Sequence, residues 1–145
     1  MQKQESFARR NQGPSAESAA ESPGPSRGQE FQELIKELTR LDRVRGGLLV
    51  APDGFVIASE LPQGLPVEPL AALAATLGRE LEVGAARLKR GPFLTALFSS
   101  DDGTLFLGGS PVGFLVVLGD REVNVGTIRV ALRKAIDTIQ SAWGS

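Results

Sequence analysis

The first segment with a regular apolar pattern begins near Gln29. Large apolar residues recur there at steps of three or four, and charged residues fill the positions between them. The apolar members are Phe31, Leu34, Ile35, Leu38 and Leu41. This spacing places them on one face of a helix. The pattern therefore predicts an amphipathic helix that ends before the pair Gly46 and Gly47.

Two short apolar runs follow, at 48–51 and 55–58, with Pro52, Asp53 and Gly54 between them. Proline fixes its own φ at a value suited to the second position of a turn, and glycine accepts a positive φ. Apolar runs on both sides of such a turn are typical of a β-hairpin. The segment 48–58 is therefore predicted to form one.

A longer helical pattern extends from Pro66 to Leu88, and it has two stripes. The first stripe carries Leu70, Ala74, Leu77, Leu81 and Leu88. The neighbouring stripe consists of small residues, which let another backbone approach the helix axis. Its members are Ala71, Ala75, Gly78 and Ala85. Gly78 and Gly84 each cost about 1 kcal/mol relative to alanine, so packing on two faces is expected to compensate.

Three strand patterns come next, at 93–99, 104–107 and 114–118. Turn residues 101–103 and a glycine-rich stretch at 108–111 separate them, so the three strands are predicted to form an antiparallel meander with a wide second connection. A last helical pattern opens at Asn124, a good helix cap, and ends at Trp143, which is expected to pack against the sheet.

Composition divides the chain into two parts. Residues 11–28 consist mainly of Ser, Ala, Gly, Pro and Glu, and such a segment buries too little apolar area to offset its ordering entropy. We expect a disordered tail at 1–28 and one domain at 29–145. Deleting the tail is expected to leave the fold intact.

The composition also excludes several kinds of chemistry. The chain contains no histidine, cysteine or tyrosine, so it lacks the usual near-neutral proton carrier, a thiolate nucleophile and cysteine metal ligands. A net charge of -1 provides no overall field for a nucleic acid. The apolar stretches are too short to span a bilayer. We therefore expect a cytoplasmic protein with no nucleic-acid or membrane partner.

Two loops contain residues of the kinds found in ligand sites. Asp53 and the pair Asp101 and Asp102 offer too few carboxylates at the spacing of a calcium loop, so they are interpreted as turn residues. The glycine-rich segment 108–113 lacks the Lys-Ser/Thr ending of a phosphate-binding loop and precedes a strand. The sequence therefore predicts neither a bound cofactor nor GTP binding by this chain itself.

Four pieces of the chain, in this order and spacing, resemble the Roadblock family. They are 41–45 leading into Gly46-Gly47-Leu48-Leu49-Val50, the turn segment 52–58, the central helix rich in alanine and leucine, and 123–129 at the start of the last helix. The resemblance extends from about Gln29 to Trp143. It implies an α+β domain of order αββαβββα, in which a five-stranded antiparallel sheet has the central helix on one face and the terminal helices on the other, as in Roadblock and profilin-like folds.

The resemblance also implies a function. It suggests a homodimer without enzymatic activity that binds a Ras-like small GTPase. Bacterial members associated with gliding motility act on their partner's GTPase cycle, and eukaryotic relatives serve as dynein light chains or GTPase scaffolds. A bacterial regulator that prefers the GTP form, and accelerates hydrolysis if it acts as an activator, is the expectation for this chain.

A dimer or partner interface is predicted from the two-faced central helix and from the strand 93–99. Neither face of this strand is convincingly polar, and the resemblance places the strand at a sheet edge, where an exposed apolar strand invites pairing. The predicted interface residues are Leu70, Ala71, Ala74, Ala75, Gly78, Arg79, Glu82, Leu94, Ala96 and Phe98.

Basic residues cluster at the end of the central helix. Arg87, Lys89 and Arg90 complement the negative end of the helix dipole. They are also possible partner contacts, which would pair with acidic groups or approach a GTPase's phosphates as an arginine finger does. Both interpretations stay open at this point.

Two other classes of function compete with this reading. Helix-flanked antiparallel sheets of this size also occur in small-molecule sensory or signalling domains, which need a cavity of roughly 300 Å³ or more with convergent polar groups. The mainly apolar and small strand residues favour a filled core instead. An enzyme based on Asp or Lys has no pair of titratable residues in an activating context.

Overall fold

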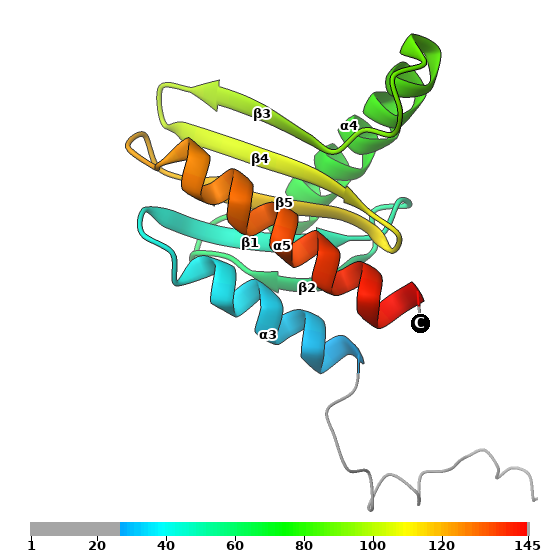
Figure 1. Ribbon diagram of the computed structural model, residues 1–145. Coiled ribbons are helices and arrows are strands. Elements are labelled where there is room, and N and C mark those ends of the chain that lie inside the picture. Colours follow the sequence, from blue (N-terminus) through cyan, green and yellow to red (C-terminus); the bar gives the residue numbers. More distant parts are fainter. Residues whose placement is uncertain (1–26, 145) are drawn as a thin grey trace, which may run out of the picture.

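The structure, a computed structural model, describes residues 27–144, which form three helices and five strands (Figure 1). In chain order these are α3 (Arg27–Thr39), β1 (Val44–Val50), β2 (Val56–Glu60), α4 (Val67–Leu88), β3 (Thr95–Ser100), β4 (Gly103–Ser110), β5 (Gly113–Gly119) and α5 (Val125–Gly144). The predicted tail 1–28 lies outside the described residues, apart from Arg27 and Gly28 in the first turn of α3. The side chain of Trp143 lies outside them too.

The five strands form one sheet of order β2-β1-β5-β4-β3, in which every neighbouring pair is antiparallel. Helices α3 and α5 cover one face and α4 crosses the other (Figure 1). The predicted α+β architecture is therefore confirmed, including the hairpin and the meander. The order leaves β2 and β3 as the two edges.

The sheet separates two apolar cores, because alternate strand residues point to opposite faces. The larger core joins the sheet to α3 and α5 through fully buried residues such as Ile35, Leu49 and Leu132. The smaller core lies under α4. Its buried members are Leu48, Val50, Ala71, Ala74, Leu107, Phe114 and Val116.

Several glycines lie inside strands where loops had been expected. Gly46 and Gly47 belong to β1, and a Cβ on Gly47 would approach the Ile35 side chain to 3.1 Å. Close packing of α3 on the strand thus requires a small residue there. The predicted wide connection at 108–111 is wrong: β4 continues through Ser110, which pairs with Gly113 and leaves a tight turn.

Local hydrogen bonds fix the turns and caps that the sequence predicted. Gly54 has a φ of +96°, and the Asp53 carboxylate accepts a bond from the Phe55 N–H at 3.0 Å. The Asn124 side chain accepts a bond from the Thr127 N–H at 2.9 Å, which is the predicted N-cap of α5.

An ion cluster joins the α3–β1 turn to the β5–α5 turn. Arg43, whose φ is +70°, lies 3.4 Å from the Asp120 carboxylate and 3.3 Å from that of Glu122. The pKa of Asp120 is lowered, chiefly because the Glu122 backbone N–H donates to its carboxylate and secondarily because Arg43 lies beside it. The pKa of Arg43 is raised, above all by its hydrogen bond to Asp120.

Candidate interaction surface

The edge strand β3 exposes large apolar side chains on both of its faces, and Leu94, which directly precedes the strand, adds another. Phe98 is 66% exposed, Leu94 51% and Leu97 41%. Leu97 lies opposite Phe106 of the larger core, whereas Phe98 lies opposite Leu105, which packs against the smaller core. The predicted residues Leu94, Ala96 and Phe98 therefore share the face on which α4 lies.

The backbone of β3 also presents unused hydrogen-bonding groups. The Gly109 N–H donates to the Leu94 carbonyl at 3.2 Å, and the register continues without a shift along β3 and β4. Bonded and non-bonded pairs alternate in an antiparallel ladder. Thr95, Leu97 and Ser99 therefore direct their N–H and C=O groups outward. Within residues 27–144, no side-chain hydrogen bond reaches these backbone groups.

Four small residues of α4 that were predicted at the interface lie on the buried side of the helix instead. Ala71, Ala74 and Ala75 are at most 2% exposed and Gly78 is buried, and Ala71 and Ala74 belong to the smaller core between α4 and the sheet. A Cβ on Gly78 would come within 2.5 Å of the Phe114 ring. The large side chains of this sheet face require small residues on the helix. These four residues are thus covered before any partner arrives, which corrects their predicted place at the dimer contact.

Large residues occupy the outer side of α4 instead. Leu73 is 50% exposed, Val83 49% and Leu88 72%, while Leu77 is 38% exposed and Leu70 is half-buried. From Arg79 to Leu88 no residue of α4 is buried. In Figure 1 this second half of the helix extends past the sheet on the β3 side. We call residues 79–88 the α4 overhang.

The predicted polar residues of α4 do not gather in one place. Arg79 donates a hydrogen bond to the Pro52 carbonyl in the β1–β2 turn, away from β3. Glu82 lies farther along the overhang, beside the surface hollow described next. Arg87, Lys89 and Arg90 are exposed at its end, where Lys89 ends the helix with a φ of +56°.

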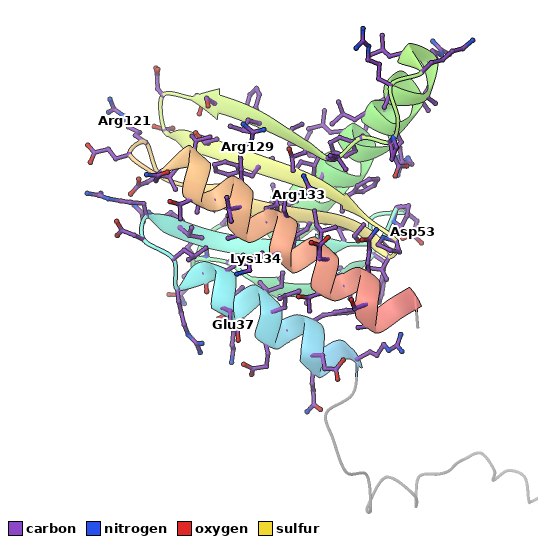
Figure 2. The ribbon with its side chains drawn as sticks, in the orientation of Figure 1. Glu37, Asp53, Arg121, Arg129, Arg133 and Lys134 are labelled. Atoms are coloured by element: carbon purple, nitrogen blue, oxygen red, sulfur yellow. The ribbon has the colours of Figure 1, made fainter. Side chains whose placement is uncertain are left out.

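A surface hollow of about 660 Å³ separates the overhang from α5. Its walls come from the end of α4, the linker 91–94, the β4–β5 turn and α5. Charged side chains of both signs stand around apolar ones, with Glu82 and Lys89 on α4 and Arg133 and Asp137 on α5. Figure 2 shows Arg133 on the exposed side of α5, with Arg129 one turn earlier and Lys134 beside it. The hollow opens at the surface, and Ile136 of the larger core forms part of its lining.

Within residues 27–144, no three Asp or Glu side chains come together as a metal-binding group. No helix in the same range has the length and apolar character needed to cross a membrane.

Comparison with known proteins identifies the family. Residues 30–118 match the Roadblock/LC7 domain, so the chain belongs to the Roadblock/LC7 family. The uncharacterized protein MJ0310 of the archaeon Methanocaldococcus jannaschii is 32% identical over 113 residues, which are 78% of this chain and 99% of that protein. The expected bacterial origin thus finds no support in this relative.

Two solved structures share the fold. Myxococcus xanthus MglB has a TM-score of 0.76 at 20% identity, with 83% of this chain and 92% of that chain covered. The gliding protein MglB of Thermus thermophilus has a TM-score of 0.69 at 20% identity, with 81% and 92% covered. At these identities the likeness establishes the α+β fold.

Proposed function

We propose that this chain is a homodimeric regulator or adaptor of a Ras-like small GTPase, which acts in the cytoplasm by protein–protein binding and without enzymatic activity of its own. The observation that carries the proposal is the β3 edge, which exposes large apolar side chains and directs backbone groups outward, in a chain of the Roadblock/LC7 family that also exposes large apolar residues on α4. Long apolar edge strands without protection are pairing sites.

The outward residues of β3 suggest a particular dimer. A two-fold axis at Leu97 would pair Leu97 with its symmetry mate and Thr95 with Ser99 of the second copy. This register uses all three outward residues, whereas a shift of the axis to Ala96 or Phe98 leaves one unpaired. The two sheets would then join into one, and each α4 overhang would extend toward the other copy's Leu94 and Phe98.

Disulfide trapping tests this register, because the native chain has no cysteine. Bonded antiparallel partners have Cα atoms about 5.5 Å apart, within the range that a disulfide bridges. Leu97→Cys is therefore expected to give a cross-linked dimer under mild oxidation. Phe55→Cys, at a hairpin turn and 70% exposed, is the matched control. Equal cross-linking of both variants, or a monomeric native protein at micromolar concentration, would refute the dimer.

Membership of the Roadblock/LC7 family supports the choice of a small GTPase as partner. The family resemblance described above implies this partner, because gliding-motility members act on the GTPase cycle of theirs. The switch segments of a small GTPase are ordered only while the γ-phosphate is present, so a regulator that contacts them should prefer the GTP form. Pulldown with a Ras-like GTPase from the same genome, loaded with GTP analogue or GDP, tests this preference. Absence of binding to both forms would refute the partner.

Substitution of Arg87 and Arg90 distinguishes two mechanisms by which this chain would accelerate GTP hydrolysis by its partner. An arginine finger contributes roughly 10³ to 10⁵ in rate, so Arg87→Ala or Arg90→Ala would nearly abolish stimulation if either residue were one. We expect milder losses that follow binding affinity, because repositioning of the switch segments needs contact alone. Single-turnover hydrolysis at saturating regulator measures the difference, and a collapse of rate at full binding would contradict repositioning.

The surface hollow favours a second candidate function, a small-molecule sensory or signalling scaffold. Its volume of about 660 Å³ exceeds the roughly 300 Å³ of a small ligand site, and charged groups converge on it. Thermal-shift screening with common anionic and zwitterionic metabolites tests this, with Ala86→Phe as a variant that fills the hollow. Stabilisation that survives Ala86→Phe would place the ligand elsewhere.

A further inference from the structure

We propose that Gln32 locks the second edge of the sheet, and that the β2 edge which it covers is a latent docking site for β2 of a second copy. Helix α3 packs along β1 and β2 (Figure 1). From there the Gln32 carboxamide reaches the backbone of Ser59. Its Nε2 donates to the Ser59 carbonyl at 2.7 Å, and its Oε1 accepts from the Ser59 N–H at 3.3 Å.

These two backbone groups are the ones that an added strand would use. Ser59 lies opposite Leu48 of β1, yet its N–H and C=O bond to Gln32, so Ser59 is a non-bonded member of the ladder and faces outward. A carboxamide carries the same donor and acceptor as a peptide group. The Gln32 side chain thus takes the place of one residue of a missing strand.

The remaining hydrogen-bonding capacity of the amide is also used. Nε2 lies 3.0 Å from a Glu60 carboxylate oxygen, so both of its hydrogens have acceptors. Hydrogen bonds to a charged group are stronger than those between neutral groups. Glu60 therefore helps to hold the Gln32 side chain over the edge.

The occupant that fits the uncovered edge is a second copy of the same strand. A two-fold axis at Ser59 would let each copy offer its Ser59 N–H to the other's carbonyl, so one register satisfies both strands. If β3 pairs as proposed above, copies that also joined at β2 would extend without closure. The lock on β2 would then be what keeps such assembly at the dimer.

The test replaces Gln32 by Met, an unbranched side chain that keeps helix propensity but makes no such hydrogen bonds. Glu33→Met, at the next and exposed position of α3, is the control. In sedimentation velocity we expect Gln32→Met to form species of at least twice the native mass, whose fraction rises with concentration, while Glu33→Met keeps the native mass. A native mass for Gln32→Met would overturn the proposal.

Cross-linking distinguishes strand pairing from misfolding. Ser59→Cys combined with Gln32→Met is expected to form a disulfide between copies at least about tenfold faster than Ser59→Cys alone, because bonded partners lie within disulfide reach. Larger species without this cross-link would overturn the proposal. The double variant Gln32→Met/Leu97→Pro tests pairing at β2 independently of pairing at β3, because Leu97→Pro blocks the β3 edge. We expect this variant to form dimers through β2. A purely monomeric double variant would contradict the lock, whether or not the native protein dimerises through β3.

A measurement on the native protein avoids dependence on any variant's folding. The Ser59 amide is expected to exchange with solvent deuterium at least about tenfold more slowly than an unbonded amide, because Gln32 accepts its hydrogen. Exchange at the rate of an unbonded amide would refute the lock.

Discussion

The β2 edge and the β3 edge end the same sheet, but within residues 27–144 side-chain hydrogen bonds cover only the backbone of the first. β2 has five residues, a bulge opposite Leu49 and Val50, the charged residue Glu60 and the Gln32 carboxamide on its outward backbone. β3 has six residues without a charge or a proline, and exposes Leu97 and Phe98. Short length, bulges and charges are the usual protections of an edge strand.

This contrast between the two edges supports the proposed assembly through β3. A domain with two unprotected edges would pair at both and grow into open-ended chains of sheets, whereas one open edge permits a closed two-fold dimer. The two halves of helix α4 differ in a similar way. Its first half packs small residues on the sheet, and its overhang exposes large ones on the β3 side.

The largest effect is expected from proline at Leu97. Its N–H points outward from β3, so proline there removes a donor needed by a partner while the bonds to β4 stay intact. Light scattering should show that the mass falls from dimer to monomer with little change in Tm. Ala96→Pro instead removes a bond to β4, and should lower Tm sharply. A native mass for Leu97→Pro would show that the copies meet elsewhere.

A smaller effect is expected from Leu77→Glu on the exposed side of α4. Burying a leucine contributes about 1.5–3 kcal/mol, so its loss should weaken dimerisation by about 10- to 100-fold at nearly unchanged monomer stability. Val130→Glu, at a 62% exposed position of α5, is the control. Dilution followed by sedimentation measures both, and equal weakening would indicate a general charge effect. Ala75→Arg is unsuited to this test, because Ala75 is buried and a charged side chain there would destabilise the fold itself.

Two glycines of α4 should respond in opposite directions. Gly78→Ala places a methyl group against the Phe114 ring, and overpacking costs about 1–3 kcal/mol, more than alanine's gain in helix propensity. Apart from the backbone of the helix itself and the neighbouring residues, no atom lies within 4 Å of a Cβ at Gly84, so Gly84→Ala should stabilise by up to about 1 kcal/mol. Urea denaturation of both variants measures this. A stabilising Gly78→Ala would contradict the packing of α4.

The smallest effect is expected on the stability of the fold at acidic pH. Because the folded-state pKa of Asp120 is lowered, its contribution to stability is complete above the unfolded pKa of about 3.9 and is lost as pH falls through the folded value. Asp120→Asn should therefore lower stability at neutral pH and flatten its decline below about pH 4. Asp101→Asn, in an exposed turn, is the control. Denaturation curves at several pH values test this, and parallel curves for Asp120→Asn and the native protein would exclude it.

Local patterns in the sequence determined much of this protein. Apolar spacing identified the three helices, and Pro52-Asp53-Gly54 and Asn124 identified a turn and a cap, because these features depend on residues close in the chain. The family resemblance supplied the antiparallel five-stranded sheet and the edge position of β3, whereas the order of its strands came from the structure. Leu94, Ala96 and Phe98, which were predicted as interface residues, share one face because alternation along a strand is fixed by its geometry, and their place in an interface stays a prediction.

Only the tertiary structure decided which face of α4 is buried and which sheet edge is closed. Either stripe of α4 could have packed on a core. The side with Ala71, Ala74, Ala75 and Gly78 is the buried one because Phe114 and other large side chains on that face of the sheet leave room only for small residues. Gln32 had no signal in the sequence, since a polar residue on a helix is ordinarily solvated. Its role arises because α3 packs beside β2, 27 residues away in the chain from Gln32 to Ser59, and contacts of that range are set by the packing of whole elements.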